Sequence, residues 1–244
     1  MYLPSWPERA RFLIGLPLSL IYFPLMLLTV VFYALIPRGL FARLQDANRA
    51  KEVAARLAAL RSHVAPGESV LDFGAGRGDF MKLVGDEFGA DMIGIDIIDY
   101  RDEGINVLLF DGRTIPLPDK SVDVSMAAFV LHHTVDQDAV LRELIRVSRQ
   151  RVVIFEDTYF SPWQYAFVVW NDYYSNILMG SLKAMKQLGK FAITSMPMPL
   201  TFRRVNAWEA FFRGHGLTVA STMVRHNAVK PMSKVTFVLD VPAA

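Results

Sequence analysis

Apolar and charged positions divide the first part of the chain into two helical segments of different character. From Phe12 to Ile36 the sequence has no charged residue. A helix of that length rises about 1.5 Å per residue and exceeds the roughly 30 Å core of a bilayer. Between residues 38 and 62 apolar positions recur every three or four residues, opposite a face rich in arginine, which predicts an amphipathic helix. We therefore expect a membrane segment over residues 1–37 and a linker or cap helix over 38–66.

The apolar segment has two membrane arrangements open to it, and a buried core helix is the alternative. Pro17 and Pro24 each remove a helix hydrogen bond, so the segment can kink and lie in the membrane plane instead of crossing it. Arg38 and Arg43 follow the segment and place its carboxyl side in the cytoplasm. The prediction is a single-pass or in-plane anchor that contacts membrane lipids and holds the rest of the chain on the cytoplasmic side.

From residue 67 to residue 244, short apolar runs alternate with helical stretches, which predicts a parallel sheet covered by helices on both faces. The expected strands are 70–73, 92–97, 106–110, 122–130 and 151–155, with helices at 79–88 and 136–148. A helix at 207–215 precedes two further strands at 217–225 and 234–241. Residues 158–205 form a variable insertion that is dense in aromatic and methionine side chains, which favour an apolar pocket or a lid facing the membrane.

The turn after the first predicted strand carries the strongest chemical signal. Gly74, Gly76 and Gly78 give the spacing GxGxG, which lets the backbone pass close to a bound nucleotide. The dinucleotide fingerprint GxGxxG requires a glycine where Asp79 stands, and this disfavours NAD or FAD. Asp72, just before the turn, is an acceptor well placed for a cationic amino group. The turn therefore points to an aminoacyl nucleoside.

Three blocks of the chain resemble, in the family's order, the class I S-adenosylmethionine-dependent methyltransferases of the small-molecule group. They are DFGAGRG from Asp72, GID ending at Asp96, and a stretch from Asp111 that contains IPLPDKSVD and ends in LHH at His133. The resemblance implies a Rossmann-like, seven-stranded α/β sheet that closes with an antiparallel pair, and S-adenosyl-L-methionine as cofactor. It assigns to the cofactor site Asp72, Gly74, Ala75, Gly76, Gly78, Asp96, Ile97, Asp111, Gly112, Ala128 and Phe129.

Candidate catalytic groups lie at the ends of the fourth and fifth predicted strands, the edge at which open α/β sheets bind ligands. His133 and Glu156 are the favoured candidates for a general base, which is needed only if the acceptor must lose a proton. The alternative for His133 is a side chain that shapes its loop. An oxygen-only metal cluster of Glu156, Asp157 and Asp172 is weakly indicated, and no metal is predicted. The insertion supplies three candidate substrate residues, Trp163, Trp170 and Tyr173.

Composition narrows the remaining function classes. The net charge of +2 is too small to indicate a nucleic-acid partner, and the absence of cysteine excludes disulfides, thiolate metal sites and a cysteine nucleophile. The prediction is a membrane-associated methyltransferase with a hydrophobic small-molecule or lipid-like acceptor. The alternatives are a non-catalytic membrane protein that binds S-adenosylmethionine, and a Rossmann oxidoreductase. The sequence makes no prediction of the oligomeric state.

Overall fold

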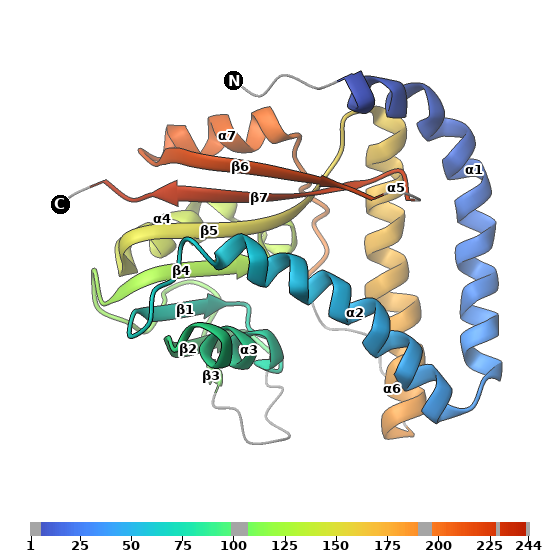
Figure 1. Cartoon of the computed structure of the whole chain (residues 1–244), viewed down its shortest axis with the longest axis horizontal. Coiled ribbons are helices and arrows are strands. Elements are labelled where there is room, and N and C mark those ends of the chain that lie inside the picture. Colours follow the sequence, from blue (N-terminus) through green and yellow to red (C-terminus); the bar gives the residue numbers. More distant parts are fainter. Residues whose placement is uncertain (1–5, 99–106, 190–196, 228–229, 243–244) are drawn as a thin grey trace.

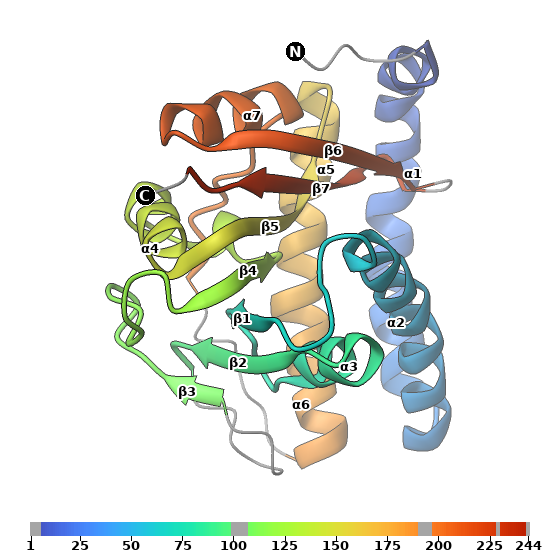
Figure 2. The ribbon, with the colours of Figure 1, turned by 60° about the vertical axis from the view of Figure 1, so that its left-hand side comes forward.

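A seven-stranded sheet organises the chain, for which a computed structural model describes residues 6–98, 107–189, 197–227 and 230–242. The strand order is β3-β2-β1-β4-β5-β7-β6. The first five strands in this order are parallel, and β7 runs antiparallel to both β5 and β6 (Figures 1 and 2). The strands are β1 Ser69–Phe73, β2 Asp91–Asp96, β3 Val107–Leu109, β4 Val122–Ala128, β5 Ser148–Thr158, β6 Thr218–His226 and β7 Ser233–Asp240. The predicted sheet with its antiparallel closing pair is confirmed.

Helices cover both faces of this sheet because alternate strand residues point to opposite sides. On one face, α2 (Arg38–Leu60) and α3 (Asp79–Phe88) bury Leu60 and Val84 against the strands. On the other, α4 (Gln137–Val147) and α7 (Val205–Gly214) bury Leu144 and Trp208. The crossovers bring the carboxyl ends of β1, β2 and β4 to one edge of the sheet, where a ligand can be bound.

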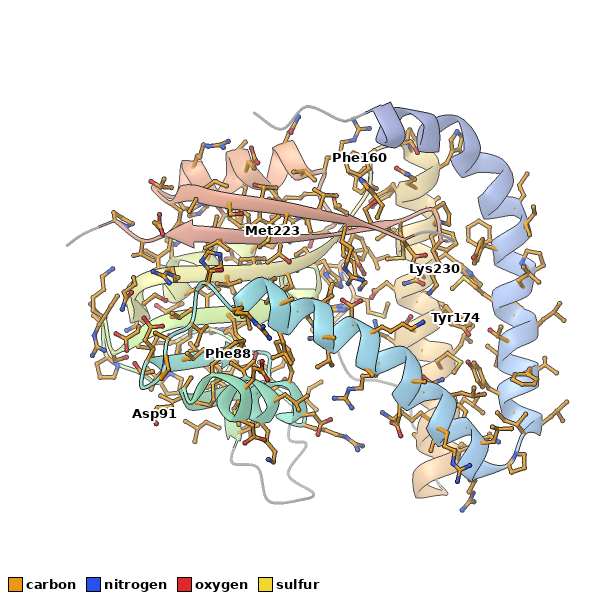
Figure 3. All side chains as sticks on the ribbon, in the orientation of Figure 1. Phe88, Asp91, Phe160, Tyr174, Met223 and Lys230 are labelled. Atoms are coloured by element: carbon orange, nitrogen blue, oxygen red, sulfur yellow. The ribbon has the colours of Figure 1, made fainter. Side chains whose placement is uncertain are left out.

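A further layer stands beside the sheet and is built from the first helix and the insertion. The helix α1 (Trp6–Leu35) runs alongside α5 (Pro162–Tyr173), which continues through a π-helical turn, η2 (Tyr174–Met179), into α6 (Gly180–Leu188) (Figure 1). The Phe23 ring contacts the rings of Phe167 and Trp170. The hydroxyls of Thr29 and Tyr174 lie 2.6 Å apart, and Tyr174 is labelled between the two helices in Figure 3. The insertion is thus a helical arm that packs against α1.

The prediction of a membrane-crossing helix receives no support. Within the described part of the chain, none of the helices combines the length and the apolar character that crossing a bilayer requires. One side of α1 packs on the helical arm, where Met26 is buried. Its other side leaves Leu28, Phe32 and Leu35 exposed, Leu35 at 80%. The helix therefore has one packed face and one uncovered apolar face.

Two other expectations need adjustment. The predicted amphipathic helix exists as α2, but Arg56, on its charged face, is half-buried, with its guanidinium 4.0 Å from the centre of the Phe80 ring. Strand β5 continues to Thr158 instead of ending at 155, because β7 pairs with it antiparallel and places Val235 opposite Glu156. Glu156 therefore lies inside a strand.

Candidate active site

A cavity of about 760 Å³ opens at the carboxyl ends of β1, β2 and β4. This volume falls in the range typical of small-molecule sites. Nine predicted site residues line it, eight from the cofactor set and one catalytic candidate: Gly74, Gly76, Asp96, Ile97, Asp111, Gly112, Ala128, Phe129 and His133. Blocks that are separated in the sequence thus meet around one volume.

The glycine turn between β1 and α3 needs its glycines for two different reasons. At Gly74 φ is +73°, and a Cβ would lie 2.5 Å from Val130 Cγ2, so a side chain would clash with the loop after β4. At Gly76 φ is +58° and, among the described residues other than its chain neighbours, no atom lies within 4 Å of the position a Cβ would take. Because Gly76 lines the cavity, that empty space is available to a ligand. The turn lets a ligand approach the backbone directly.

The carboxylate of Asp96, at the end of β2, is held in place by the backbone. The N–H of Gly76 donates to Oδ2 at 2.8 Å and the N–H of Ile98 donates to Oδ1 at 2.9 Å. Each carboxylate oxygen retains further acceptor capacity. Asp96 therefore couples the glycine turn to β2 and offers fixed acceptors to hydroxyl groups of a ligand.

Asp111 and Phe129 shape opposite parts of the cavity. Asp111 accepts hydrogen bonds from the N–H groups of Thr114 and Arg113, which lower the pKa of its carboxyl and close the loop after β3. Phe129 follows β4 with φ of +60°, an uncommon conformation for a residue with a side chain, and its N–H donates to the carbonyl of Phe155. Such strain tends to occur at functional sites, where the surrounding structure maintains it.

Three residues of the predicted cofactor set do not line the cavity. Ala75 donates its N–H to the carbonyl of Ile95. A Cβ added to Gly94 would lie 3.1 Å from the Ala75 Cβ, so the Ala75 side chain packs on β2. Gly78 caps α3 in a left-handed conformation. Asp72 is buried at the end of β1, where Arg56 of α2 acts on it electrostatically. These three residues therefore support the turn without lining the cavity.

Replacing Asp72 by asparagine is expected to stabilise the fold above neutral pH. Burial raises the pKa of Asp72 to about 7, against the opposing charge of Arg56. A carboxyl whose pKa is raised on folding stabilises the protein fully only below its unfolded pKa, and that stability is lost as pH rises through about 7. The stability gained by Asp72→Asn, measured by urea unfolding, should therefore grow from about pH 4 to 7 and reach on the order of 4 kcal/mol at pH 8.

Asp123 provides the matched control for this measurement. Hydrogen bonds from the N–H and hydroxyl of Ser69 lower the pKa of Asp123, so Asp123→Asn should reduce stability at pH 8 and lose this effect at low pH. If Asp72→Asn were instead less stable than the unmodified protein at pH 8, the ionised carboxylate of Asp72 would have to be better paired than its burial implies.

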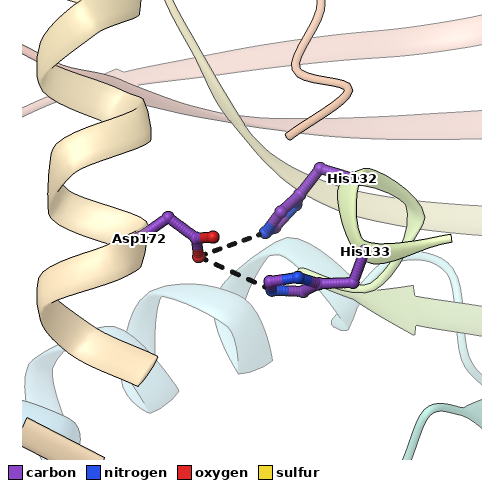
Figure 4. A group of neighbouring side chains, drawn as sticks. All are labelled: His132, His133 and Asp172. Atoms are coloured by element: carbon purple, nitrogen blue, oxygen red, sulfur yellow. Dashed lines mark ion pairs between the residues drawn. The ribbon is translucent and has the colours of Figure 1, made fainter. Parts of the chain in front are cut away.

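A buried polar cluster lies next to the cavity, around the two histidines of the short helix η1 (Leu131–His133) after β4 (Figure 4). The His132 Nδ1 lies 2.5 Å from Glu156 Oε2, and its Nε2 lies 3.6 Å from Asp172 Oδ1. The His133 Nε2 lies 3.5 Å from the same Asp172 oxygen. The carbonyl of Pro197 accepts a hydrogen bond from His133 Nδ1 at 3.1 Å, which places the proton of a neutral ring on Nδ1.

The two histidines differ in charge because their surroundings differ. Burial lowers the pKa of His132, but the carboxylates of Glu156 and Asp172 outweigh this and raise it to about 10. Burial and the neighbouring His132 charge lower the pKa of His133 to about 4. At neutral pH, His132 is the charged partner of two carboxylates, and His133 is neutral at the cavity wall.

The structure changes the roles expected of the predicted catalytic and substrate residues. Glu156 is fully buried, bonded to His132, and does not line the cavity, so it positions His132 instead of contacting a ligand. The predicted substrate residues also lie away from the cavity. Trp170 stacks with Tyr173 and contacts Phe23 of α1, and Trp163 is 47% exposed. The described aromatic side chains of the arm thus form no lid over the glycine turn.

Sequence reasoning missed part of the cavity wall. Beyond His133, the segment leading into α4 lines the cavity with Thr134, Val135, Asp136, Ala139 and Val140, and Pro197 faces it from the end of the insertion. Their position directly after LHH was a usable signal for the first group. Pro197 offered none, because its proximity depends on how the insertion folds back.

Comparisons with known proteins agree with this geometry. Residues 71–155 match the family model described as a methyltransferase domain. The ubiquinone/menaquinone biosynthesis C-methyltransferase UbiE of Burkholderia cenocepacia is 34% identical over 111 residues, which cover 39% of this chain and 46% of that protein. UbiE of Vibrio campbellii is 31% identical over 108 residues, covering 37% and 42%. The chain therefore spans less than half the length of the curated relatives it matches.

Solved structures show the same fold at low sequence identity. A methyltransferase of Aquifex aeolicus, described as dependent on S-adenosylmethionine, has a TM-score of 0.51 at 16% identity, covering 85% of this chain and all of that one. Geranyl diphosphate C-methyltransferase of Streptomyces coelicolor has a TM-score of 0.56 at 12% identity, covering 83% and 85%. The chain thus has the class I methyltransferase fold, with the matched domain at its centre.

Proposed function

We propose that this chain, which carries a methyltransferase domain on the class I fold, transfers a methyl group from S-adenosylmethionine to a hydrophobic small molecule at a membrane surface. The observation that carries the proposal is the convergence of the glycine turn, Asp96 and the loop after β4 on one cavity. An oxidoreductase of the Rossmann type is less well supported, because Asp79 occupies the position of its third glycine.

The described residues fit the cofactor. Gly76 leaves open space where a side chain would stand, so the backbone can lie against the bound molecule. Asp96 offers acceptors to the ribose hydroxyls, and Ile97 and Phe110 supply apolar walls suited to a flat base. When bound, the cofactor supplies a methyl group on a positively charged sulfur, which is already activated for transfer.

The contribution of the protein is to align the acceptor and to exclude water. The wall formed by Val135, Val140 and Pro197 is apolar and favours a hydrophobic acceptor. The UbiE relatives are named for quinone biosynthesis and the Streptomyces enzyme for geranyl diphosphate, so both names denote hydrophobic or isoprenoid chemistry. We take an aromatic or isoprenoid small molecule as the acceptor class. His133 lines the cavity and is neutral at pH 7, so it remains the candidate for the predicted general base.

Two ligand titrations and one product analysis test the proposal. S-adenosylhomocysteine should raise the melting temperature of the purified full-length chain by mass action, and NAD should not. Incubation with methyl-labelled cofactor and an apolar extract should then label a hydrophobic product. Stabilisation by NAD alone would support the oxidoreductase, and cofactor binding without any labelled product would support the non-catalytic alternative.

Membrane attachment is part of the same proposal, in its in-plane form. The exposed side of α1 presents a row of large apolar side chains, Leu20, Ile21, Leu25, Leu28, Phe32 and Leu35. Contiguous exposed apolar surface of this kind marks a membrane or partner contact. Arg38 and Arg43 follow directly and favour anionic headgroups on the cytoplasmic side.

Polar substitutions on the exposed side of α1 are expected to release the protein from membranes. A variant with Leu25→Gln, Leu28→Gln and Leu35→Gln removes exposed apolar area without touching the packed face. It should co-sediment with anionic phospholipid vesicles at least tenfold less than the unmodified chain. The control variant, Leu83→Gln with Leu109→Gln, alters exposed apolar residues on α3 and β3 and should sediment normally. Equal sedimentation of all three proteins would show that α1 does not attach the protein to membranes.

A further inference from the structure

The cluster beside the cavity has the composition and spacing of a metal site. His132, His133 and Asp172 are buried, and each offers one possible ligand atom, with the three atoms within 4.8 Å of one another (Figure 4). The two nitrogen-to-oxygen separations, 3.6 and 3.5 Å, are too long for good hydrogen bonds. They resemble the spacing of roughly 3.3 Å between neighbouring ligands of a tetrahedral ion bound at 2.0–2.1 Å.

The outer partners of these side chains are those that metal-bound histidines require. A ligating imidazole donates its second N–H to a carboxylate or a backbone carbonyl, which fixes the ring and its tautomer. His132 has Glu156 on its Nδ1, and His133 has the carbonyl of Pro197 on its Nδ1. Both Nε2 atoms are therefore directed toward Asp172 and away from these supports.

Asp172 supplies an independent observation. Its Oδ1 accepts a hydrogen bond from Asn176 Nδ2 at 2.7 Å, which orients the carboxylate from the π-helical turn η2. Its Oδ2 is buried, and among the described residues no donor reaches it. A buried carboxylate oxygen without a partner is costly, and a cation bound by both oxygens of Asp172 would satisfy it. Turns of the π-helical type also occur frequently at functional sites.

We propose that His132, His133 and Asp172 bind a divalent first-row transition ion such as Zn²⁺, with at least one coordination position open to an oxygen ligand in the cavity. Two imidazoles and one carboxylate favour such an ion over Mg²⁺ or Ca²⁺, which prefer all-oxygen sites. Three protein ligands with an open position are typical of catalytic metal sites. Asp157, part of the oxygen-only cluster considered from sequence, is instead 3.2 Å from Lys234 Nζ.

This metal site would add the binding of the acceptor to the proposed function, and this role of the ion rests on that function. Because His133 lines the cavity, the open position adjoins the space assigned to the acceptor. A bound ion would hold an acceptor oxygen and lower the pKa of a hydroxyl, with the proton passing to water. Ion binding itself does not depend on methyl transfer, so the two proposals fail separately.

Metal binding is tested on the full-length chain produced without a polyhistidine tag. After treatment with a chelator and dialysis, the protein is titrated with Co²⁺ and Zn²⁺. We expect one ion per chain, visible Co²⁺ ligand-field bands of a four- or five-coordinate site, and displacement of Co²⁺ by Zn²⁺. Asp172→Asn and His133→Ala should weaken binding by at least about 100-fold, and Glu156→Gln by roughly 10- to 100-fold.

The matched control uses a second histidine–aspartate pair in the same chain. His215 Nε2 lies 3.1 Å from Asp138 Oδ1, and among the described residues the pair has no third ligand, so His215→Ala should leave binding unchanged. Retained binding of S-adenosylhomocysteine by Asp172→Asn would show that this variant is folded. Ion binding that is absent, is equal in the variants, or is lost in His215→Ala would overturn the proposal. The cluster would then be a buried ion pair that docks α5 against η1.

Discussion

Replacing Glu156 by alanine is expected to lower the free energy of unfolding by about 3 to 5 kcal/mol, the largest loss of stability expected of any single substitution considered. Glu156 is fully buried, its Oε2 lies 2.5 Å from His132 Nδ1, and its Oε1 accepts the His132 N–H at 3.3 Å. Removing it leaves the charged ring of His132 with only the more distant carboxylate of Asp172, and leaves a buried backbone donor without its acceptor. Urea unfolding at pH 7 in the presence of a chelator measures the loss without any contribution from a metal.

A histidine–aspartate pair whose carboxylate is exposed separates the effect of burying the carboxylate from the effect of the contact itself. Asp138→Ala removes the contact between Asp138 and His215, but the Asp138 side chain is 57% exposed. Exposed ion pairs contribute about 1 kcal/mol at most. If Glu156→Ala costs no more than Asp138→Ala, the His132 ring must lose its charge and repack at little cost, and its charged state in the folded protein would be refuted.

Replacing Asp96 by alanine is expected to weaken binding of S-adenosylhomocysteine roughly 10- to 150-fold. The carboxylate is predicted to accept bonds from the ribose, and a hydrogen bond to a charged group contributes about 1.5 to 3 kcal/mol. The same substitution removes the acceptor of the Gly76 N–H, which holds the glycine turn against β2. Calorimetric titration measures the affinity. The Asp96→Asn protein keeps one acceptor oxygen, so its affinity should lie between those of the unmodified protein and Asp96→Ala.

Asp86→Asn is the control for Asp96. Asp86 pairs with Lys82 on the exposed surface of α3 and is remote from the cavity lining, so its substitution should leave affinity unchanged. An Asp96→Ala protein with unaltered affinity would show that the ligand does not use the end of β2, and the cofactor site would have to lie elsewhere.

The elements of the sheet could be predicted from the sequence, as could the eight of the eleven proposed cofactor residues that line the cavity, because their signals are local. Positive φ at Gly74, Gly76 and Gly78 is a property of the turn itself, and the helix that follows begins at Asp79 and ends at Phe88 as its pattern predicts. The spacing from the turn to Asp96 reflects one helix and one strand, so it too is contained in a short stretch of chain. The length over which β5 pairs with β7 was less predictable from the sequence, since β5 is longer than its apolar run.

Side-chain direction and long-range contact were decided by the tertiary structure. The sequence placed Asp72 at the cofactor, but α2 packs across β1 and brings Arg56 to it. It placed Trp163, Trp170 and Tyr173 at the substrate, but α1 supplies the surface on which the helical arm packs. An aromatic side chain in a variable segment has the same composition signal whether it faces a pocket or another helix.

The sequence by itself determined which strands and turns form, that a ligand-sized cavity lies at their carboxyl ends, and that Gly74, Gly76, Asp96 and Asp111 line it. Only the tertiary structure brought Asp172, from the arm, to His132 and His133, and placed Pro197 behind the second ring. Backbone conformation is set by residues adjacent in the chain, whereas a cluster drawn from separate elements depends on how those elements pack. No spacing in the sequence encodes that packing.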